Sequence, residues 1–198
     1  MPDNPNISTR ERLLMSGALL FAEKGFKGGS VREICEHAGT SMNMIHHYFG
    51  SKAGLMDAIV EQFSSRVFEV PMRLLDPPAK SQDDFRSRIE MVFEATLDAY
   101  IEQRLVLMVV VREQADPPAL IQYMNHFTAF LEQAKQKGFV RNELDVEMVT
   151  GVMLDRISNQ VQFAPWVKRN YGTDLSDPEY KKRWCASNLD LFLNGMLG

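Results

Sequence analysis

The apolar residues of this chain recur with the spacing of amphipathic helices and almost never alternate as they do in a strand. The first apolar face consists of Leu13, Gly17, Leu20 and Phe21, at positions i, i+4, i+7 and i+8. The stretch Val106–Val111 is rich in β-branched residues, but it lies inside a longer helical pattern. We interpret it as a buried helix, although its propensity would also permit a strand. The pattern predicts an all-α protein.

Capping residues, glycines and prolines divide the chain into predicted helices. Ser8 with Glu11, and Ser30 with Glu33, have the spacing of capping boxes, and Asp76-Pro77-Pro78 is the clearest break. The predicted helices cover residues 8–25, 30–39, 41–48, 51–75, 83–103, 105–114, 119–137, 146–170 and 178–195. The order is therefore three short helices followed by six longer ones.

Residues 30–48 have the local features of a helix-turn-helix. Gly39 supplies the positive φ that a tight turn requires, and Ser41 is expected to cap the next helix at once. Ile34 and Ile45 form an apolar seam that fixes the crossing of the two helices. In this motif the second helix enters the major groove with its N-terminal residues toward the base edges. Helical hairpins inside ordinary bundles show the same pattern, so the pattern alone does not establish DNA binding.

Composition fits a globular protein but does not by itself point to DNA. Apolar residues make up 45% of the 198 residues and charged residues 24%, which provides for a sizeable core. The net charge is −4, and residues 1–57 carry six basic and six acidic side chains, so the helix-turn-helix region is only the less acidic end. The chain has no run of about 18 apolar residues and a polar start, which predicts a cytoplasmic protein without a membrane span.

Motifs of catalysis and of cofactor binding are not found. The sequence contains no P-loop, no dinucleotide fingerprint and no nucleophile elbow, so neither an enzyme nor a cofactor is expected. Cys35, His37, His46 and His47 fit no zinc pattern, and no metal is expected. Cys35 and Cys185 are interpreted as inert small apolar residues rather than as sensors of oxidants.

A series of motifs runs in unbroken register through residues 10–55. An arginine near the start is followed by Phe21-x-x-x-Gly25-Phe26, Ser30-Val-Arg-Glu-Ile34, Ala38-Gly39-x-Ser41, an aromatic-rich run into Phe49, and Ser51-Lys52-x-x-Leu55. This series resembles the N-terminal domain of the TetR/AcrR family of transcriptional regulators. The resemblance implies a helix-turn-helix that reads DNA.

The rest of the chain resembles that family more loosely. The matching segments are Lys137-Gly138-Phe139-Val140-Arg141 and Leu191-Phe192-x-x-Gly195. The chain also departs from the family in three places. Gly17 and Cys35 stand where alanine is usual, and His46-His47 replace a common tyrosine pair. The first two are packing changes, whereas the histidine pair bears on individual contacts with the DNA backbone.

The resemblance implies which residues contact DNA. They surround the turn and the second helix of the motif: Ser30, Thr40, Ser41, Met42, Asn43, Met44, His47, Tyr48 and Lys52. Ser30 and Lys52 are expected to meet phosphates, and His47 and Tyr48 to meet the DNA backbone. Asn43 is the best candidate for direct reading, because its amide can bond bidentately to adenine, whereas methionines offer only apolar contact.

The resemblance also implies a regulatory domain. It divides the chain into a three-helix DNA-binding domain, residues 1–51, and a six-helix effector-binding and dimerisation domain, residues 52–198. The candidate effector contacts, which could equally be core residues, are Phe68, Met72, Met91, Tyr100, Met108, Arg112, Tyr123 and Phe127. Because these are mostly apolar, a small and largely apolar effector is expected. Arg112 is interpreted as paired with Glu113 or Glu90, or alternatively as receiving an effector carboxylate.

A homodimer is expected through the last two helices, in a four-helix bundle. The candidate interface residues recur on one face of each helix: Val149, Val152, Met153, Ile157, Leu189, Phe192, Leu193 and Met196.

The sequence thus predicts an effector-responsive repressor that binds a palindromic operator in double-stranded DNA as a homodimer. Effector binding would tilt the fourth helix and move the two recognition helices off the groove spacing of the operator. Two alternatives remain at this point. One is a helical interaction protein without an effector, and the other is a small-molecule-binding protein with no operator.

Overall fold

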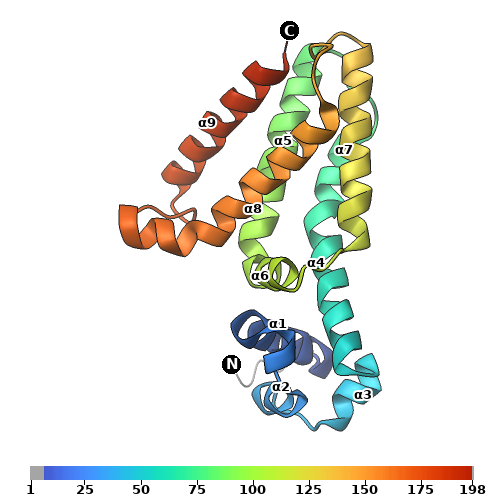
Figure 1. The fold of residues 1–198 in the computed structure, drawn as a ribbon, viewed down its shortest axis with the longest axis vertical. Helices are drawn as coiled ribbons and strands as arrows, with labels where there is room; N and C mark the ends of the chain where they lie inside the picture. Colours follow the sequence, from blue (N-terminus) through green and yellow to red (C-terminus); the bar gives the residue numbers. More distant parts are fainter. Residues whose placement is uncertain (1–6, 198) are drawn as a thin grey trace. The chain divides into compact units, whose positions relative to one another are not determined.

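The computed structural model describes residues 7–197, and all regular secondary structure in that range is helical (Figure 1). This confirms the predicted all-α fold. The helices are α1 (Thr9–Gly28), α2 (Val31–His37), α3 (Asn43–Phe49), α4 (Lys52–Leu75), α5 (Gln82–Glu102), α6 (Arg104–Glu113), α7 (Pro118–Gln136), α8 (Val146–Tyr171) and α9 (Pro178–Met196). None of these helices is long and apolar enough to cross a membrane.

The chain separates into two compact units. The N-terminal unit contains the described residues up to Ser64 together with Leu105–Pro117, and the C-terminal unit contains Ser65–Arg104 and the described residues from Pro118 onward. Helix α6 therefore belongs to the same unit as α1–α3 and the first half of α4, although it is far from them in sequence. The division of function at residue 51 stays a prediction, since compactness does not test it.

The N-terminal unit is built on a small, fully buried core. Leu13, Phe21, Ile34, Ile45 and Leu55 each have 0% of their surface exposed. They come from α1, α2, α3 and α4, so every helix of the DNA-binding half contributes to one seam. The predicted pairing of an α2 isoleucine with an α3 isoleucine across the turn is thus part of this core.

Most helix ends follow the sequence closely. Helix α1 is one exception, because it continues to Gly28, past its predicted end at Gly25, where the backbone is non-helical. Both predicted capping boxes are present, at Ser8 and at Ser30. Ser51 caps α4, because its Oγ accepts the Gly54 amide at 3.0 Å. The prediction that Ser41 caps α3 is wrong. The helix begins two residues later, and its N-cap, Met42, makes no side-chain capping bond.

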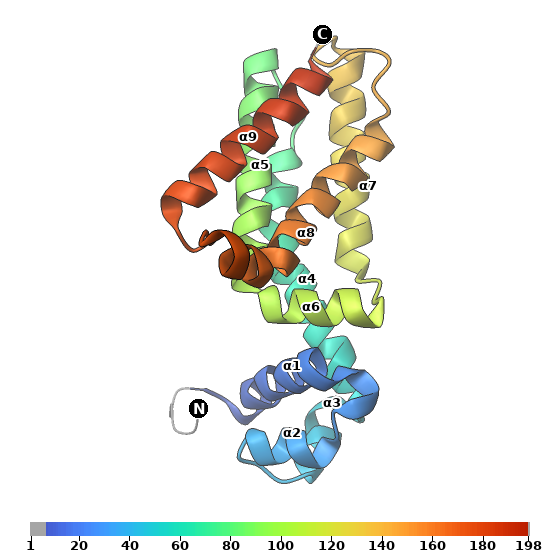
Figure 2. The ribbon, with the colours of Figure 1, turned by 60° about the vertical axis from the view of Figure 1, so that its left-hand side comes forward.

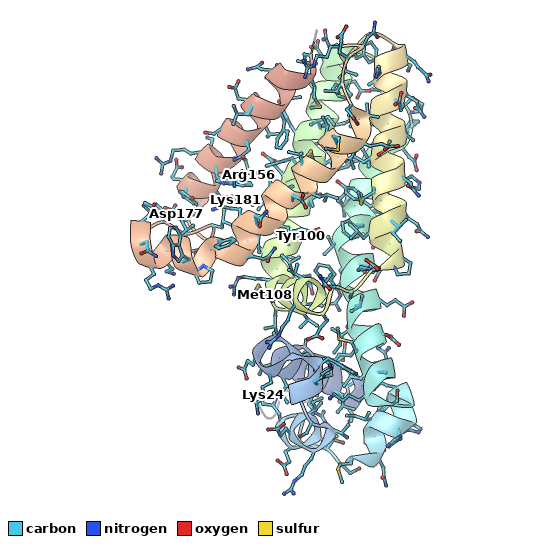
Figure 3. The ribbon with its side chains drawn as sticks, viewed as in Figure 1. Lys24, Tyr100, Met108, Arg156, Asp177 and Lys181 are labelled. Atoms are coloured by element: carbon cyan, nitrogen blue, oxygen red, sulfur yellow. The ribbon has the colours of Figure 1, made fainter. Side chains whose placement is uncertain are left out.

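The C-terminal unit is a helical bundle with an aromatic core. Helix α8 packs against both α5 and α7, and α9 packs against α5 (Figures 1 and 2). Stacked rings join these helices, with 5.6 Å between the centroids of Phe93 and Trp184. Two polar contacts of α9 also hold the bundle together, and Figure 3 labels one residue of each, Arg156 on α8 and Lys181 on α9. The Arg156 Nε donates to Asn188 at 2.7 Å, and Lys181 forms an ion pair with an aspartate of α5.

Candidate nucleic-acid interface

The turn between α2 and α3 is closed by its own backbone. The Thr40 amide donates to the Cys35 carbonyl at 3.0 Å, and the Gly39 amide donates to the Glu36 carbonyl at 3.2 Å. Gly39 has φ of 63°, the left-handed conformation that the sequence predicted for this position. A tight turn of this kind fixes the start of α3 relative to α2.

The start of α3 presents polar and flexible side chains to the outside. Ser41, Met42 and Asn43 are exposed, and Thr40 and Met44 are half-buried. These are the residues that the resemblance assigns to the groove, and the structure brings them together at one end of one helix. Amide, hydroxyl and thioether groups at a helix start can reach the edges of bases.

The two residues assigned to the DNA backbone lie further along α3. His47 and Tyr48 are exposed, and their rings contact each other with 4.8 Å between centroids. The neighbouring ring of Phe49 lies 6.1 Å from that of Tyr48 and carries the Arg10 guanidinium 5.4 Å above it. The C-terminal half of α3 thus has an aromatic surface next to a cation.

Arg12 joins α1 to the end of α2, a role that the sequence analysis did not assign. Its Nε donates to the Ala38 carbonyl at 3.0 Å, its Nη1 to the Ile7 carbonyl at 3.1 Å and its Nη2 to the Thr9 hydroxyl at 3.1 Å. Ala38 is the C-cap of α2, so the guanidinium satisfies a carbonyl at the edge of the turn. No local signal marks this contact, because its partner is a backbone atom 26 positions away.

Lys24 and Glu33 form a second link between α1 and α2. The Lys24 Nζ lies 2.6 Å from the Glu33 Oε1, and Figure 3 labels Lys24 on α1. The same carboxylate accepts from the Ser30 backbone and hydroxyl in the capping box. The hydrogen bond from Lys24, and next that from Ser30, lower the pKa of Glu33 to about 2. The Ser30 hydroxyl hydrogen is therefore already donated, and its predicted phosphate contact would compete with Glu33.

Lys52 is held by aromatic rings at the start of α4. Its Nζ lies 4.6 Å from the centroid of the Phe26 ring and 5.9 Å from that of Phe21. The side chain is half-buried, so its ammonium is oriented by these two faces rather than moving freely in solvent. An ammonium fixed in this way is suited to a phosphate contact at one defined place.

The two cysteines do not resemble reactive thiols. Both are buried, and burial raises the pKa of Cys35 above its usual value and that of Cys185 to about 11. A thiol with a raised pKa stays protonated at neutral pH and is a poor nucleophile. Among the described residues, no three histidine, cysteine or acidic side chains converge as metal ligands would.

Four of the candidate effector residues converge in the C-terminal unit. The Phe68 ring stacks on Tyr123 with 4.9 Å between centroids and meets Tyr100 edge-on at 6.4 Å. The Phe127 ring follows at 5.9 Å from Tyr123. Met72 is half-buried, whereas Met91 is 44% exposed. The sequence thus identified an aromatic cluster, and whether an effector binds there stays a prediction.

Tyr123 is the unusual member of this aromatic cluster. Its side chain is 0% exposed, and its hydroxyl makes no hydrogen bond of normal geometry. The Thr96 hydroxyl donates its own hydrogen to the Val92 carbonyl at 2.7 Å, and its oxygen lies close enough to the Tyr123 hydroxyl to lower the pKa of Tyr123 in part. Burial raises the pKa of both Tyr100 and Tyr123, so both remain protonated donors. A buried hydroxyl without a hydrogen bond of normal geometry is a group that a ligand oxygen could satisfy better.

Met108 and Arg112 are placed differently from the aromatic cluster. Both lie on α6 and belong to the N-terminal unit. The Arg112 Nη1 donates to the Ala22 and Glu23 carbonyls of α1, at 3.1 and 3.2 Å. Its Nε lies 4.0 Å from Glu113, which the sequence analysis named as one of two acidic partners. Its effector contact stays a prediction, although these donors are already occupied.

The candidate dimer residues divide into an inner and an outer set. Five of them are buried in their own unit: Met153, Ile157, Leu189, Leu193 and Met196. Val149 and Phe192 are half-buried, and Val152 is 52% exposed. The inner set is buried because a regular apolar stripe on an amphipathic helix faces the core of its own chain first. Only the outer three have surface available for a partner.

That choice included only one member, Val152, of an exposed row on α8. Its members are exposed and follow one another at intervals of four, three, four, four and three residues: Met148, Val152, Asp155, Asn159, Phe163 and Trp166. This spacing keeps them on one side of a helix. Four of the six are large apolar side chains, among them Met148, which is 65% exposed, and Phe163, which is 57% exposed. The signal was present in the sequence, but the stronger apolar stripe beside it was chosen.

Known proteins share both the motif and the fold. The model of the family described as bacterial regulatory proteins, tetR family, matches residues 13–59. The transcriptional repressor KstR2 of Mycolicibacterium smegmatis is 27% identical over 161 residues, which cover 75% of this chain and 76% of that repressor.

Solved structures match the chain over nearly its whole length. The ketosteroid transcriptional regulator KstR2 of Mycobacterium tuberculosis has a TM-score of 0.72 at 21% identity, with 96% of each chain covered. FadR from Bacillus subtilis in complex with stearoyl-CoA has a TM-score of 0.71 at 18% identity, with 93% of this chain and 97% of FadR covered. At these identities the structures establish a shared fold.

The link between α1 and α2 predicts an acid titration. In the folded protein the Glu33 carboxyl should titrate at a pH of about 2, well below its usual 4.5, when followed by carbon NMR. Because the folded pKa is lowered, the stabilisation is present above the usual pKa and is lost as the pH falls toward 2. Lys24→Met should move the titration toward the usual value, and Lys27→Met should not. If the pKa of Glu33 were the same in Lys24→Met as in the wild type, the link between Lys24 and Glu33 would be contradicted.

Proposed function

Because the chain belongs to the tetR family of bacterial regulatory proteins and is a DNA-binding transcriptional regulator, we propose that it represses genes from a two-fold symmetric operator. Two copies would each place one α3 in a major groove, and an effector in the C-terminal unit would release the DNA. The observation that carries this proposal is the start of α3. There a buried core fixes a short helix whose exposed end presents Ser41, Met42 and Asn43.

Base reading and phosphate binding fall to different residues in this proposal. The exposed Asn43 amide reads an adenine edge, because one amide can donate and accept at once. Lys52, oriented by two rings, contacts a phosphate, which is the same at every sequence. The region is close to neutral in charge, so specific contacts carry a larger share of the affinity than a diffuse basic surface would.

These roles predict different responses to substitution. On a duplex that the wild-type protein enriches from a random pool, Asn43→Ala should lose about 1–3 kcal/mol of discrimination at one base position in each half-site. Lys52→Ala should weaken binding to all sequences alike. It should also reduce the slope of the logarithm of the binding constant against the logarithm of the salt concentration by about one per half-site. Fluorescence anisotropy over a range of salt concentrations measures both effects. Equal losses on matched and scrambled DNA from the Asn43 change would exclude it as a base reader.

The exposed row on α8 supports a homodimer. Met148, Val152, Phe163 and Trp166 would lie in water if the chain were alone, at a cost of roughly 25 cal/mol for each Å² of apolar surface. On α9 the side chain of Leu191 is 74% exposed. A second copy that packs its own α8 and α9 on this surface would bury both sets, and a two-fold operator requires such a pairing.

A charged side chain in the exposed row on α8 should therefore prevent two copies of the chain from forming a dimer. Val152→Asp should give monomers in sedimentation velocity, because the carboxylate would be buried without a partner in an apolar interface. Val70→Asp is the matched control, since Val70 is an equally simple apolar residue, 44% exposed, on α4. It should leave the assembly unchanged. A Val152→Asp protein with the sedimentation of the wild type would refute this placement of the interface.

The aromatic cluster supports a largely apolar effector that carries an oxygen. Phe68, Tyr100, Tyr123 and Phe127 offer ring faces, and the Tyr123 hydroxyl, which makes no hydrogen bond of normal geometry, offers one donor. The similar KstR2 is described as a ketosteroid regulator, and FadR was solved with stearoyl-CoA. A ketosteroid and stearoyl-CoA both combine a large apolar part with a carbonyl oxygen. We place the effector of this chain in the same chemical class.

Tyr123 gives this proposal a test in two parts. Tyr123→Phe should raise the free energy of unfolding of the ligand-free protein by about 1 kcal/mol, because it removes a buried hydroxyl that makes no hydrogen bond of normal geometry. It should also reduce the thermal shift produced by stearoyl-CoA or a keto-steroid in the wild-type protein. A destabilised variant would show that the hydroxyl already has a partner. No shift with either compound in the wild type would refute the effector class.

A further inference from the structure

Two neighbouring side chains at the end of α6 bind the backbone of α1. The Arg112 Nη1 donates to the carbonyls of Ala22 and Glu23, at 3.1 and 3.2 Å. The Glu113 Oε1 accepts from the Phe26 amide at 2.9 Å, across 87 positions of sequence. Helices α6 and α1 belong to the same compact unit and lie next to each other in both views (Figures 1 and 2).

These contacts replace a hydrogen bond that α1 itself has lost. In a continuous helix the Phe26 amide would donate to the Ala22 carbonyl four residues back. Gly25, with φ of 77° and ψ of 168°, breaks the helix between them. Glu113 then takes the free amide, and Arg112 takes the free carbonyl. The pair on α6 thus satisfies both halves of one broken helical hydrogen bond.

A glycine is required at the break for two reasons. Its positive φ is strained for any other residue. A Cβ at Gly25 would also lie 3.1 Å from the Glu113 Oε1 and 3.2 Å from two nitrogens of Arg112. A side chain at this position would be strained at this φ and would also crowd the two groups of α6, which would then have to shift.

The break lies beside the proposed phosphate contact. Phe26, whose backbone Glu113 holds, is the residue whose ring lies 4.6 Å below the Lys52 ammonium. The ring of Phe21, 5.5 Å from that of Phe26, completes the support. A continuous path of contacts therefore runs from α6 through the break in α1 to the first residue of α4.

We propose that Glu113 and Arg112 are positioning residues that set Lys52 for its phosphate contact, so that the end of α6 controls DNA affinity. This inference rests on the proposed DNA-binding function. Glu113 contributes more, because it is a charged acceptor with a side chain only 26% exposed. The Arg112 side chain is 48% exposed, and at 4.0 Å its ion pair with Glu113 is a weak surface contact.

A double-mutant cycle on operator DNA tests the path. Glu113→Ala should weaken binding by about threefold and Lys52→Ala by about tenfold, while the double variant should lose about tenfold rather than about thirtyfold. Glu113→Gln should restore most of the affinity, because its carbonyl oxygen can still accept from the Phe26 amide. Asp116→Ala is the matched control, with the same charge change at an exposed site on the segment after α6, and it should bind as the wild type does.

Hydrogen exchange at the Phe26 amide gives a readout that does not depend on DNA. Glu113→Ala should speed its exchange by about tenfold or more, and Glu113→Gln and Asp116→Ala should not. Additive losses in the cycle, or an unchanged Phe26 amide in Glu113→Ala, would overturn the positioning role alone. If the wild-type protein enriches no DNA from a random pool, the proposed DNA-binding function fails. The exchange rate of the Phe26 amide still shows in that case whether Glu113 holds the break in α1.

Discussion

What α3 presents to DNA depends on the burial of Ile45. A helix of seven residues is not stable in water by itself, and Ile45 is its one buried residue. Phe21, Ile34 and Leu55, from three other helices of the same unit, are also 0% exposed, so Ile45 belongs to one buried core with them. Because such a core is close-packed, α3 cannot rotate or slide without opening a cavity. The exposed end of the helix therefore keeps one orientation, which is what base reading requires.

Several polar contacts of the N-terminal unit have the same physical role, which is to satisfy backbone groups where helices end or break. Arg12 takes the carbonyl at the end of α2, Ser30 and Glu33 close the start of α2, and Arg112 and Glu113 serve the break in α1. An unpaired backbone group in a half-buried place costs about as much as a lost hydrogen bond. Helix ends and breaks are thus the points at which one helix can hold another. A shift of α6 would first change the contacts at the break in α1.

Sequence reasoning succeeded where the determining interactions are local. The capping boxes at Ser8 and Ser30 and the left-handed Gly39 depend on residues within a few positions of each other, and all three are present. Ser41 shows the limit of this reasoning, because a serine before a helix caps it only if the backbone turns at that residue, and here the turn ends later.

Reasoning from sequence was weaker where a choice depends on distant packing. The apolar stripe of α8 and α9 indicated a partner surface, but Ile157 and Leu193 are covered by their own chain, and the exposed row lies beside them. Arg112 could be given acidic partners from its neighbourhood, yet its main partners are carbonyls about ninety residues away, at a break that only the folded chain shows.

In the proposed complex, two copies of α3 read two half-sites. A single-base scan of a duplex enriched from a random pool tests this arrangement, with each base pair replaced in turn and the affinity of the full chain determined. We expect two clusters of sensitive positions, related by a two-fold axis and about one helical turn or somewhat more apart. A single cluster, or sensitivity spread evenly along the duplex, would contradict it.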